Sequence, residues 1–180
     1  MDKKTILRFA SFVPFLALNF NLSFADISSN IAGYRAKNQV EDQAMTITIQ
    51  QERADAIDAY FSDRSMPLKG YGMKMVLEAE KHDIDWRLLP AIAIRESSGG
   101  KFACKNNPFG WDSCKTNFKS VNEAIEVVAR NLGGNNPRTQ KYYTGETMEK
   151  LYSYNGTVIR TYPAEVFNIM NRLGVSGIDA

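Results

Sequence analysis

The sequence predicts a mainly α-helical protein with one principal domain, and three observations support this fold class. The chain has 180 residues, of which 44% are hydrophobic, and this is enough for one domain with a sizeable core. Apolar residues recur at helical spacing in several segments, whereas no segment alternates long enough to predict a β-strand. No internal repeat is visible, so we expect one group of packed helices.

The first 25 residues have the pattern of a secretory signal peptide. Lys3, Lys4 and Arg8 precede a mostly apolar stretch over residues 9–20, and Ser23-Phe24-Ala25 offers small residues at a cleavage site. The stretch is short for a membrane span, which needs about 20 residues. An uncleaved anchor or a buried helix are the alternatives. We therefore expect a periplasmic or extracellular protein that meets the membrane only through this signal peptide.

The charge distribution excludes one class of partner. The formal net charge is +2, and loss of the signal peptide leaves a neutral mature chain. Acidic residues outnumber basic residues over 26–63, and the reverse holds over 64–180. Such a weak basic excess argues against a nucleic-acid-binding protein and only weakly favours a polyanionic partner such as a cell wall.

The region before the main domain is expected to be a polar leader with one helix. Residues 26–51 lack sustained periodicity and are interpreted as mobile or loosely helical. Residues 52–64 carry the apolar stripe of a helix, and Pro67 follows its end. We accordingly divide the mature chain into a leader over 26–66 and a domain over 67–177.

Five helices are expected in the main domain, over residues 70–82, 86–97, 120–132, 147–152 and 163–173. The second of these is apolar nearly all round, which predicts a central position. Pro90 is tolerated only in a first turn, so this helix should become regular near Leu88. Ser120-Val121-Asn122-Glu123 is a capping box that predicts the start of the third.

Histidine and cysteine are scarce, which limits the chemistry. The chain has one histidine, His82, and two cysteines, so it lacks the clusters of a conventional zinc or iron site, and we expect no cofactor. In an oxidising compartment a Cys104–Cys114 disulfide is the expected state, worth about 2–3 kcal/mol by loop closure. Two free buried thiols are the alternative. Catalysis, if any, must depend on carboxylates, hydroxyls, amides or the backbone.

Glu96 is the strongest candidate for such chemistry. It lies where the most apolar helix ends, at the negative end of the helix dipole and among apolar neighbours. Both effects disfavour the ionised carboxylate and so favour the protonated form that a general acid requires. A solvated glutamate at a helix end is the alternative interpretation.

Residues 86–100, with Ile94-Arg95-Glu96-Ser97-Ser98-Gly99-Gly100, resemble the catalytic helix of lysozyme-like peptidoglycan hydrolases, including lytic transglycosylases and bacterial glucosaminidases. Asn107-Pro108-Phe109-Gly110-Trp111 is similar to an Asn-x-Phe-Gly-aliphatic segment of glucosaminidases. Tyr154-Asn155-Gly156 is similar to the Tyr-Asn-x-Gly element of transglycosylases, and Tyr162-Pro163 to the start of their closing helix. The resemblance covers roughly residues 67–175. Two departures are Gly110-Trp111-Asp112, where Gly-Leu-Met-Gln is usual, and the missing residue between Asn155 and Gly156.

The resemblance implies a single lysozyme-like helical domain with the disulfide-closed loop beside an active site. Glu96 would be the general acid/base of an enzyme that cleaves β-1,4 bonds of peptidoglycan, acting as a monomer. The candidate substrate-binding residues are Ser97, Asn107, Phe109, Trp111, Asp112, Tyr154 and Asn155. A non-catalytic wall-binding or scaffold protein, and a secreted partner-binding helical domain, are the competing hypotheses.

Several of these candidates have a structural alternative. Asp112 would position a water for an inverting hydrolysis if it lay about 6.5–9.5 Å from Glu96, and is otherwise a solvated loop acid. Tyr154 is expected to bond Glu96 or a sugar, or to be a core tyrosine with a satisfied hydroxyl. Trp111 is a candidate sugar-stacking residue. Phe109 is more typical of a core residue, and Asn107 of a residue that pins the loop backbone.

Overall fold

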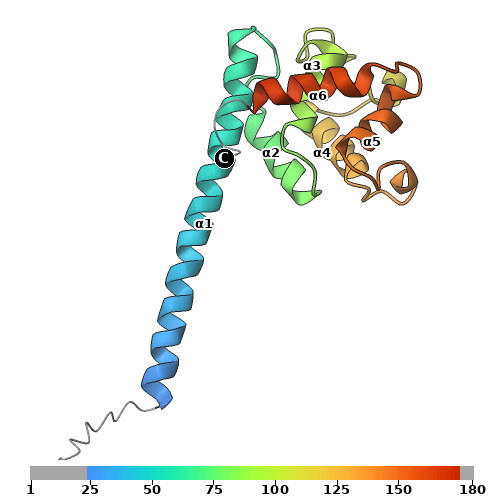
Figure 1. Ribbon diagram of the computed structural model, residues 1–180. Coiled ribbons are helices and arrows are strands. Elements are labelled where there is room, and N and C mark those ends of the chain that lie inside the picture. Colours follow the sequence, from blue (N-terminus) through green and yellow to red (C-terminus); the bar gives the residue numbers. More distant parts are fainter. Residues whose placement is uncertain (1–23, 175–180) are drawn as a thin grey trace, which may run out of the picture. The chain divides into compact units, whose positions relative to one another are not determined.

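The structure is a computed structural model that describes residues 24–174, with side chains from residue 31 onward. Residues 1–23 of the expected signal peptide lie outside the described residues. The described part is mainly helical, as expected, with α1 (Phe24–Asp63), α2 (Gly72–Lys81), α3 (Leu88–Ser97), α4 (Val121–Leu132), α5 (Thr147–Leu151) and α6 (Tyr162–Leu173) (Figure 1). Within residues 24–174 no β-strand forms, and no helix is both long and apolar enough to cross a membrane.

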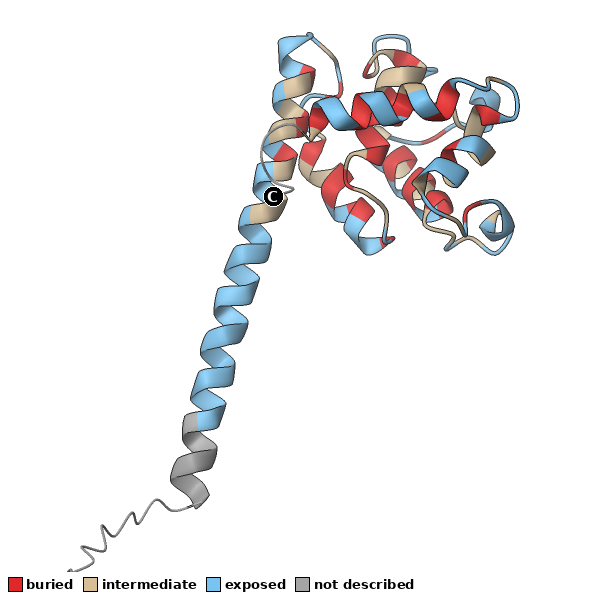
Figure 2. Cartoon of the chain, viewed as in Figure 1, coloured by how far each residue is buried: buried red, intermediate tan, exposed pale blue. Residues whose placement is uncertain are grey.

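Helix α1 extends much further than the predicted helix over 52–64. It runs for 40 residues through most of the region interpreted as a mobile or loosely helical leader. The segment contains no proline and only one glycine, Gly33, so little in it opposes a helix. Residues 31–48 are exposed, as Figure 2 shows, and an apolar stripe is therefore not needed there.

The chain divides into two compact units, one up to Glu41 and one from Asp42 onward. In the second unit α1 contributes Ala54, Ile57 and Phe61 to the hydrophobic core, each with at most 1% of its surface exposed. The packed part of the protein therefore begins before residue 67, where we expected its boundary. The reason is that the apolar stripe of the last turns of α1 is buried against the other helices.

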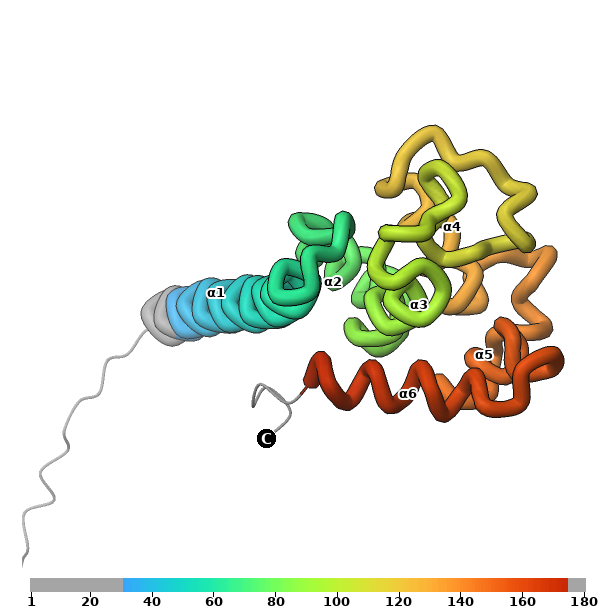
Figure 3. The backbone as a smooth tube through the Cα atoms, turned by 90° about the horizontal axis from the view of Figure 1, so that it is seen from above, coloured from blue at the N-terminus to red at the C-terminus, as the bar shows by residue number. Residues whose placement is uncertain are grey.

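Helix α3 forms the centre of this unit. Residues 88–93 are six consecutive buried residues, which agrees with the prediction of a central helix. Helices α2, α4 and α6 pack against α3, and α6 lies beside it with its axis across that of α3 (Figure 3). Pro90 lies in the first turn of α3, where its missing N–H has no helical partner to lose.

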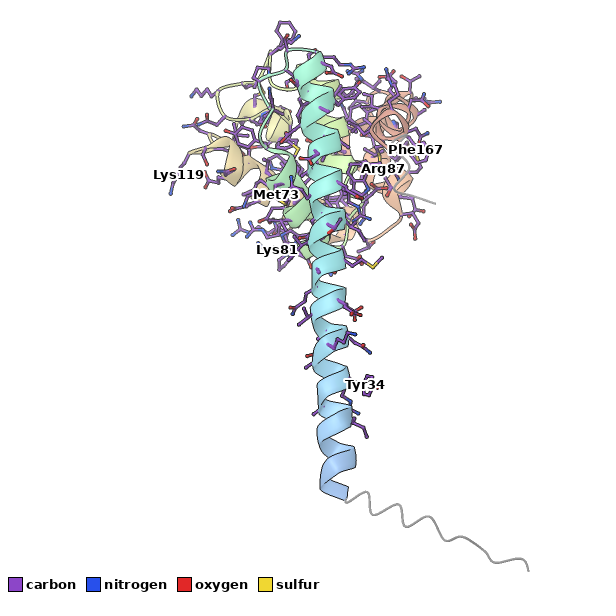
Figure 4. All side chains as sticks on the ribbon, turned by 90° about the vertical axis from the view of Figure 1, so that its left-hand side faces the viewer. Tyr34, Met73, Lys81, Arg87, Lys119 and Phe167 are labelled. Atoms are coloured by element: carbon purple, nitrogen blue, oxygen red, sulfur yellow. A yellow bond between two sulfur atoms is a disulfide. The ribbon has the colours of Figure 1, made fainter. Side chains whose placement is uncertain are left out.

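The surface of the unit is formed by the outer sides of the same helices. Lys81 at the end of α2 and Phe167 on α6 point outward (Figure 4), and 41% of the Phe167 surface is exposed. The predicted cap of α4 is confirmed, since Ser120 Oγ accepts a hydrogen bond from the Glu123 backbone N–H at 3.2 Å. The Glu123 carboxylate accepts from the backbone N–H of Lys119 rather than from that of Ser120.

Candidate functional site

A groove of about 830 Å³ lies beside the C-terminal end of α3. Glu96 lines it from α3, and apart from Thr116 the remaining lining comes from three later segments. These are the disulfide loop, which we define as residues 104–114, the segment 138–143, and the π-helical turn Tyr152–Gly156. The groove therefore brings together Glu96, Trp111, Asp112, Tyr154 and Asn155 from the candidates predicted by the sequence.

The disulfide loop approaches the Glu96 carboxyl closely on one side. Its Oε1 is buried and has no hydrogen-bond partner among the described residues. Its Oε2 faces Gly110, because a Cβ added to this glycine would lie only 2.9 Å from that oxygen. Gly110 also has a left-handed φ of 62°, so a glycine suits this position for both steric and conformational reasons. The lack of a side chain here lets the disulfide loop approach the carboxyl closely.

Tyr162 is a neighbour of Glu96 that we did not name as a site residue. Its hydroxyl is buried without a hydrogen-bond partner in the described part of the chain. Burial, together with the nearby Tyr154 and Glu96, raises the pKa of Tyr162 far above its usual range, so the hydroxyl stays protonated. The Tyr162 hydroxyl thus lies close enough to the Glu96 carboxyl to act on it, although no hydrogen bond of regular geometry joins them. The sequence did contain a signal for this residue, because Tyr162-Pro163 resembles the start of the closing helix of transglycosylases. We used that resemblance to support the fold and did not assign Tyr162 to the site.

The predicted disulfide is present and closes the loop beside the groove. Cys104 and Cys114 are bonded with their Cα atoms 6.0 Å apart, and no cysteine is left free, so the alternative of two free thiols is wrong. Inside the loop, Asn107 is 1% exposed. Its Nδ2 donates to the carbonyl of Trp111 at 2.9 Å and its Oδ1 accepts from the Trp111 N–H at 3.1 Å. Asn107 therefore pins the loop backbone, as its structural alternative proposed.

Ser97 and Phe109 are buried behind the site, and neither side chain lines the groove. Ser97 is buried, and its hydroxyl lies 2.7 Å from the carbonyl oxygen of Pro108, to which it donates, while it accepts from the N–H of Gly100 at 3.0 Å. The Phe109 ring is completely buried in the core. Both residues join the disulfide loop to α3 rather than facing a substrate.

Tyr154 has features of a residue that faces a substrate and also of a core tyrosine with a satisfied hydroxyl. It lines the groove, yet its hydroxyl donates to the carbonyl of Phe109 at 2.6 Å instead of bonding Glu96. Its ring stacks on Tyr162 with centroids 6.0 Å apart, and lies 5.7 Å from the Trp111 ring. Burial, followed by the charge of Glu96, raises the pKa of Tyr154 well above its usual value. Tyr154 is therefore a fixed, uncharged part of an aromatic wall.

Asp112 is the second carboxylate of the groove. It is exposed, and its Oδ2 accepts a hydrogen bond from the Thr116 hydroxyl at 3.0 Å. Asp112 is therefore an exposed loop acid that also lines the groove, and its role in positioning a water stays a prediction. The backbone at Asp112 has a φ of 53°, in the left-handed region, and this conformation belongs to the disulfide loop rather than to a helix.

Four lining residues were missed because the segment 133–146 has no helical or strand periodicity. Tyr143 packs 6.3 Å from the Trp111 ring, and burial raises its pKa to about 12. Tyr142 is half exposed, and Arg138 and Thr139 complete the wall. The pair Tyr142-Tyr143, separated by four residues from the glycine- and asparagine-rich turn 133–137, was the one signal that could have indicated them.

The site thus offers one carboxyl with an unsatisfied oxygen, an aromatic wall and one guanidinium. Within the described residues, no group of three or more histidine, cysteine, aspartate or glutamate side chains is arranged to hold a metal ion. Comparison of the chain with protein-family models, with curated proteins and with solved structures found no match in any of the three.

Proposed function

We propose that the protein is a secreted enzyme that cleaves β-1,4 glycosidic bonds of peptidoglycan, with Glu96 as the single general acid/base. The observation that carries this proposal is the position of Glu96 at the end of the buried helix α3, with an orphaned Oε1, beside a groove of about 830 Å³. The motif resemblance and the expected signal peptide support a lysozyme-like domain that acts in the cell envelope.

The groove suits a chain of sugars. Trp111, Tyr143 and Tyr154 present adjacent aromatic rings in its lining, and sugar rings stack on such faces through their apolar C–H groups. The Tyr143 hydroxyl and the Trp111 indole supply polar groups that can fix an orientation, whereas the Tyr154 hydroxyl already donates to the Phe109 carbonyl.

In the proposed reaction Glu96 donates its proton to the glycosidic oxygen as the bond breaks. The positive charge that develops on the sugar ring is then met by a nucleophile, and the Glu96 carboxylate recovers a proton from it. That nucleophile is a water in a lysozyme or glucosaminidase, and a hydroxyl of the substrate in a lytic transglycosylase. Asp112 is the other carboxylate in the groove and is therefore our candidate to hold such a water.

The decisive variant is Glu96→Gln, which keeps the shape of the side chain and removes its proton transfer. We expect release of soluble fragments from purified peptidoglycan to fall by about 10²–10⁴-fold, the usual contribution of a general acid. Glu52→Gln on the exposed part of α1 is the control and should retain full activity. Circular dichroism should be unchanged in both, and full activity of Glu96→Gln would overturn the proposal.

The products separate the reaction types. Mass spectrometry would show an anhydro end for a transglycosylase, a reducing muramic acid for a lysozyme and a reducing glucosamine for a glucosaminidase. The alternative, a non-catalytic wall-binding protein, is suggested by the exposed position of Asp112 and its bond to Thr116. It predicts that the wild-type protein sediments with purified wall and releases no fragments.

A further inference from the structure

Arg138 is the one basic residue among those that line the groove. Its side chain is exposed, and it forms no ion pair with another residue in the described part of the chain. The acids of the lining are Glu96 and Asp112, and the Asp112 carboxylate is bonded to Thr116 instead. The groove therefore contains a guanidinium that is available to an anionic group of a ligand.

The backbone that carries Arg138 is held firmly to α4. Asn131 is 2% exposed, and its Oδ1 accepts hydrogen bonds from Asn136 Nδ2, at 2.9 Å, and from the Thr139 hydroxyl. Its Nδ2 donates to the carbonyl of Val127 at 2.7 Å, inside α4. Asn136 Oδ1 in turn accepts from the backbone N–H of Arg138 at 3.1 Å.

The buried side-chain amide of Asn131 thus holds the turn that carries Arg138, because it binds Asn136 before Arg138 and Thr139 after it. Ordering a loop during binding costs free energy, and a loop that is already ordered avoids that cost. The arrangement therefore fixes the backbone from which the Arg138 side chain extends into the groove before any ligand arrives.

The planar guanidinium pairs best with a carboxylate or a phosphate, to which it makes two parallel hydrogen bonds. The sugars of a stem-bearing peptidoglycan strand carry no charge, because the lactyl carboxyl of each muramic acid is bound to the stem as an amide, whereas the peptide stems themselves carry carboxylates. We propose that Arg138 recognises a carboxylate of a peptide stem, so that the enzyme prefers strands whose stem carboxylates are free. This inference rests on the proposed function and names the substrate class of the same groove.

The test compares two substrates: glycan strands with intact peptide stems, and the same strands whose stem carboxylates have been converted to amides, because removal of the stems by an amidase would leave a new lactyl carboxylate on each muramic acid. For the wild-type protein we expect kcat/KM to be about tenfold higher on strands with free stem carboxylates, as a charge-assisted hydrogen bond at a partly solvated site would give. Arg138→Ala should lose this preference, so that its kcat/KM is the same on both substrates. Arg138→Lys keeps the charge without the bidentate geometry and should retain part of the preference.

Lys141→Ala is the matched control, because Lys141 is a nearby exposed cation that lies over the Tyr142 ring, 4.8 Å from its centroid, and does not line the groove. It should preserve the preference. Equal rates of the wild-type protein on both substrates, or an equal loss on both in Arg138→Ala, would overturn the role of Arg138 while leaving the proposed function intact. If the wild-type protein released fragments from neither substrate, the proposed function itself would fail.

Discussion

The two sides of the groove are built by different forces. On one side the helical body, which we define as α2, α3, α4 and α6, holds Glu96 through a core in which residues 88–93 are all buried. On the other side the disulfide loop has few buried side chains and five residues with left-handed φ values, namely Lys105, Gly110, Asp112, Ser113 and Cys114. Each non-glycine residue with a left-handed φ costs roughly 1–2 kcal/mol of conformational free energy.

The loop is therefore held by its attachments rather than by its own conformational preference. The attachments are the disulfide, the two hydrogen bonds of Asn107 to Trp111 and the bond from Ser97 to Pro108. The position of Glu96 therefore depends on apolar packing, whereas the positions of the aromatic and acidic groups opposite it depend on one disulfide and a few hydrogen bonds. Changes to the two sides should therefore have different consequences for stability and activity.

The largest effect on stability is expected from a cavity in the helical body. Ile92 on α3 is completely buried, and Ile92→Ala should lower the free energy of unfolding by about 2–5 kcal/mol, because lost transfer energy adds to an unfilled cavity. Urea unfolding followed by circular dichroism measures this. Ile94→Ala is the control: Ile94 is only partly buried on the same helix, so its loss should be clearly smaller. Equal losses of unfolding free energy in the two variants would contradict a closely packed core around α3.

The next effect is expected from opening the disulfide loop. Replacing both Cys104 and Cys114 by serine should lower the free energy of unfolding by about 2–3 kcal/mol, since the unfolded chain is no longer constrained. Activity on peptidoglycan should fall further than the folded fraction does, because Trp111 and Gly110 lose their fixed place beside Glu96. Retained helical circular dichroism with full activity would show that the loop needs no covalent closure.

This contrast also explains what the sequence could and could not predict. Helices α2, α3, α4 and α6 were predicted closely, because their apolar spacing, the Ser120 cap and Pro90 are local signals. The disulfide followed from the number of cysteines and the expected compartment. The pinning role of Asn107 was proposed from the loop in which it lies.

The contacts that complete the site were not local. The bond of Tyr154 to the Phe109 carbonyl joins residues 45 positions apart, and Tyr162 approaches Glu96 only when α6 packs on α3. Arg138 and Tyr143 lie in a segment without periodicity. The last part of α1 was predicted as a helix over 52–64, whereas its regular continuation before residue 52 was not, because an exposed helix needs no apolar stripe and shows none.

A smaller change in stability, with a large change in activity, is expected from Gly110→Ala. The added Cβ would lie 2.9 Å from Glu96 Oε2, and the left-handed φ of 62° adds roughly 1 kcal/mol of strain. Fragment release should fall at least tenfold while the protein remains folded. Gly70→Ala is the matched control, since Gly70 has a φ of 92° and nothing within 4 Å of its added Cβ. Equal activity losses in both variants would show that strain, and not the contact with Glu96, is responsible.

The smallest change is expected from pH, and it should come from the helical body. Burial raises the pKa of the Glu78 carboxyl, but hydrogen bonds from Lys74 and Lys81 outweigh this and leave the pKa below its usual 4.5. Burial lowers the pKa of His82 below 6.5; Glu78 opposes the shift, while Lys81 and Arg130 add to it. Both groups bind protons less readily when folded, so stability is full above their unfolded pKa values and falls as the pH falls.

The contribution of His82 is lost first, below pH 6.5, and that of Glu78 below pH 4.5. Urea midpoints at about pH 7.5, 5.5 and 4 should therefore decrease in two steps for the wild-type protein. His82→Gln, which keeps a polar group beside Asn135, should remove the first step and retain the second. A wild-type protein that gained stability on acidification would place the sensitive groups outside the helical body.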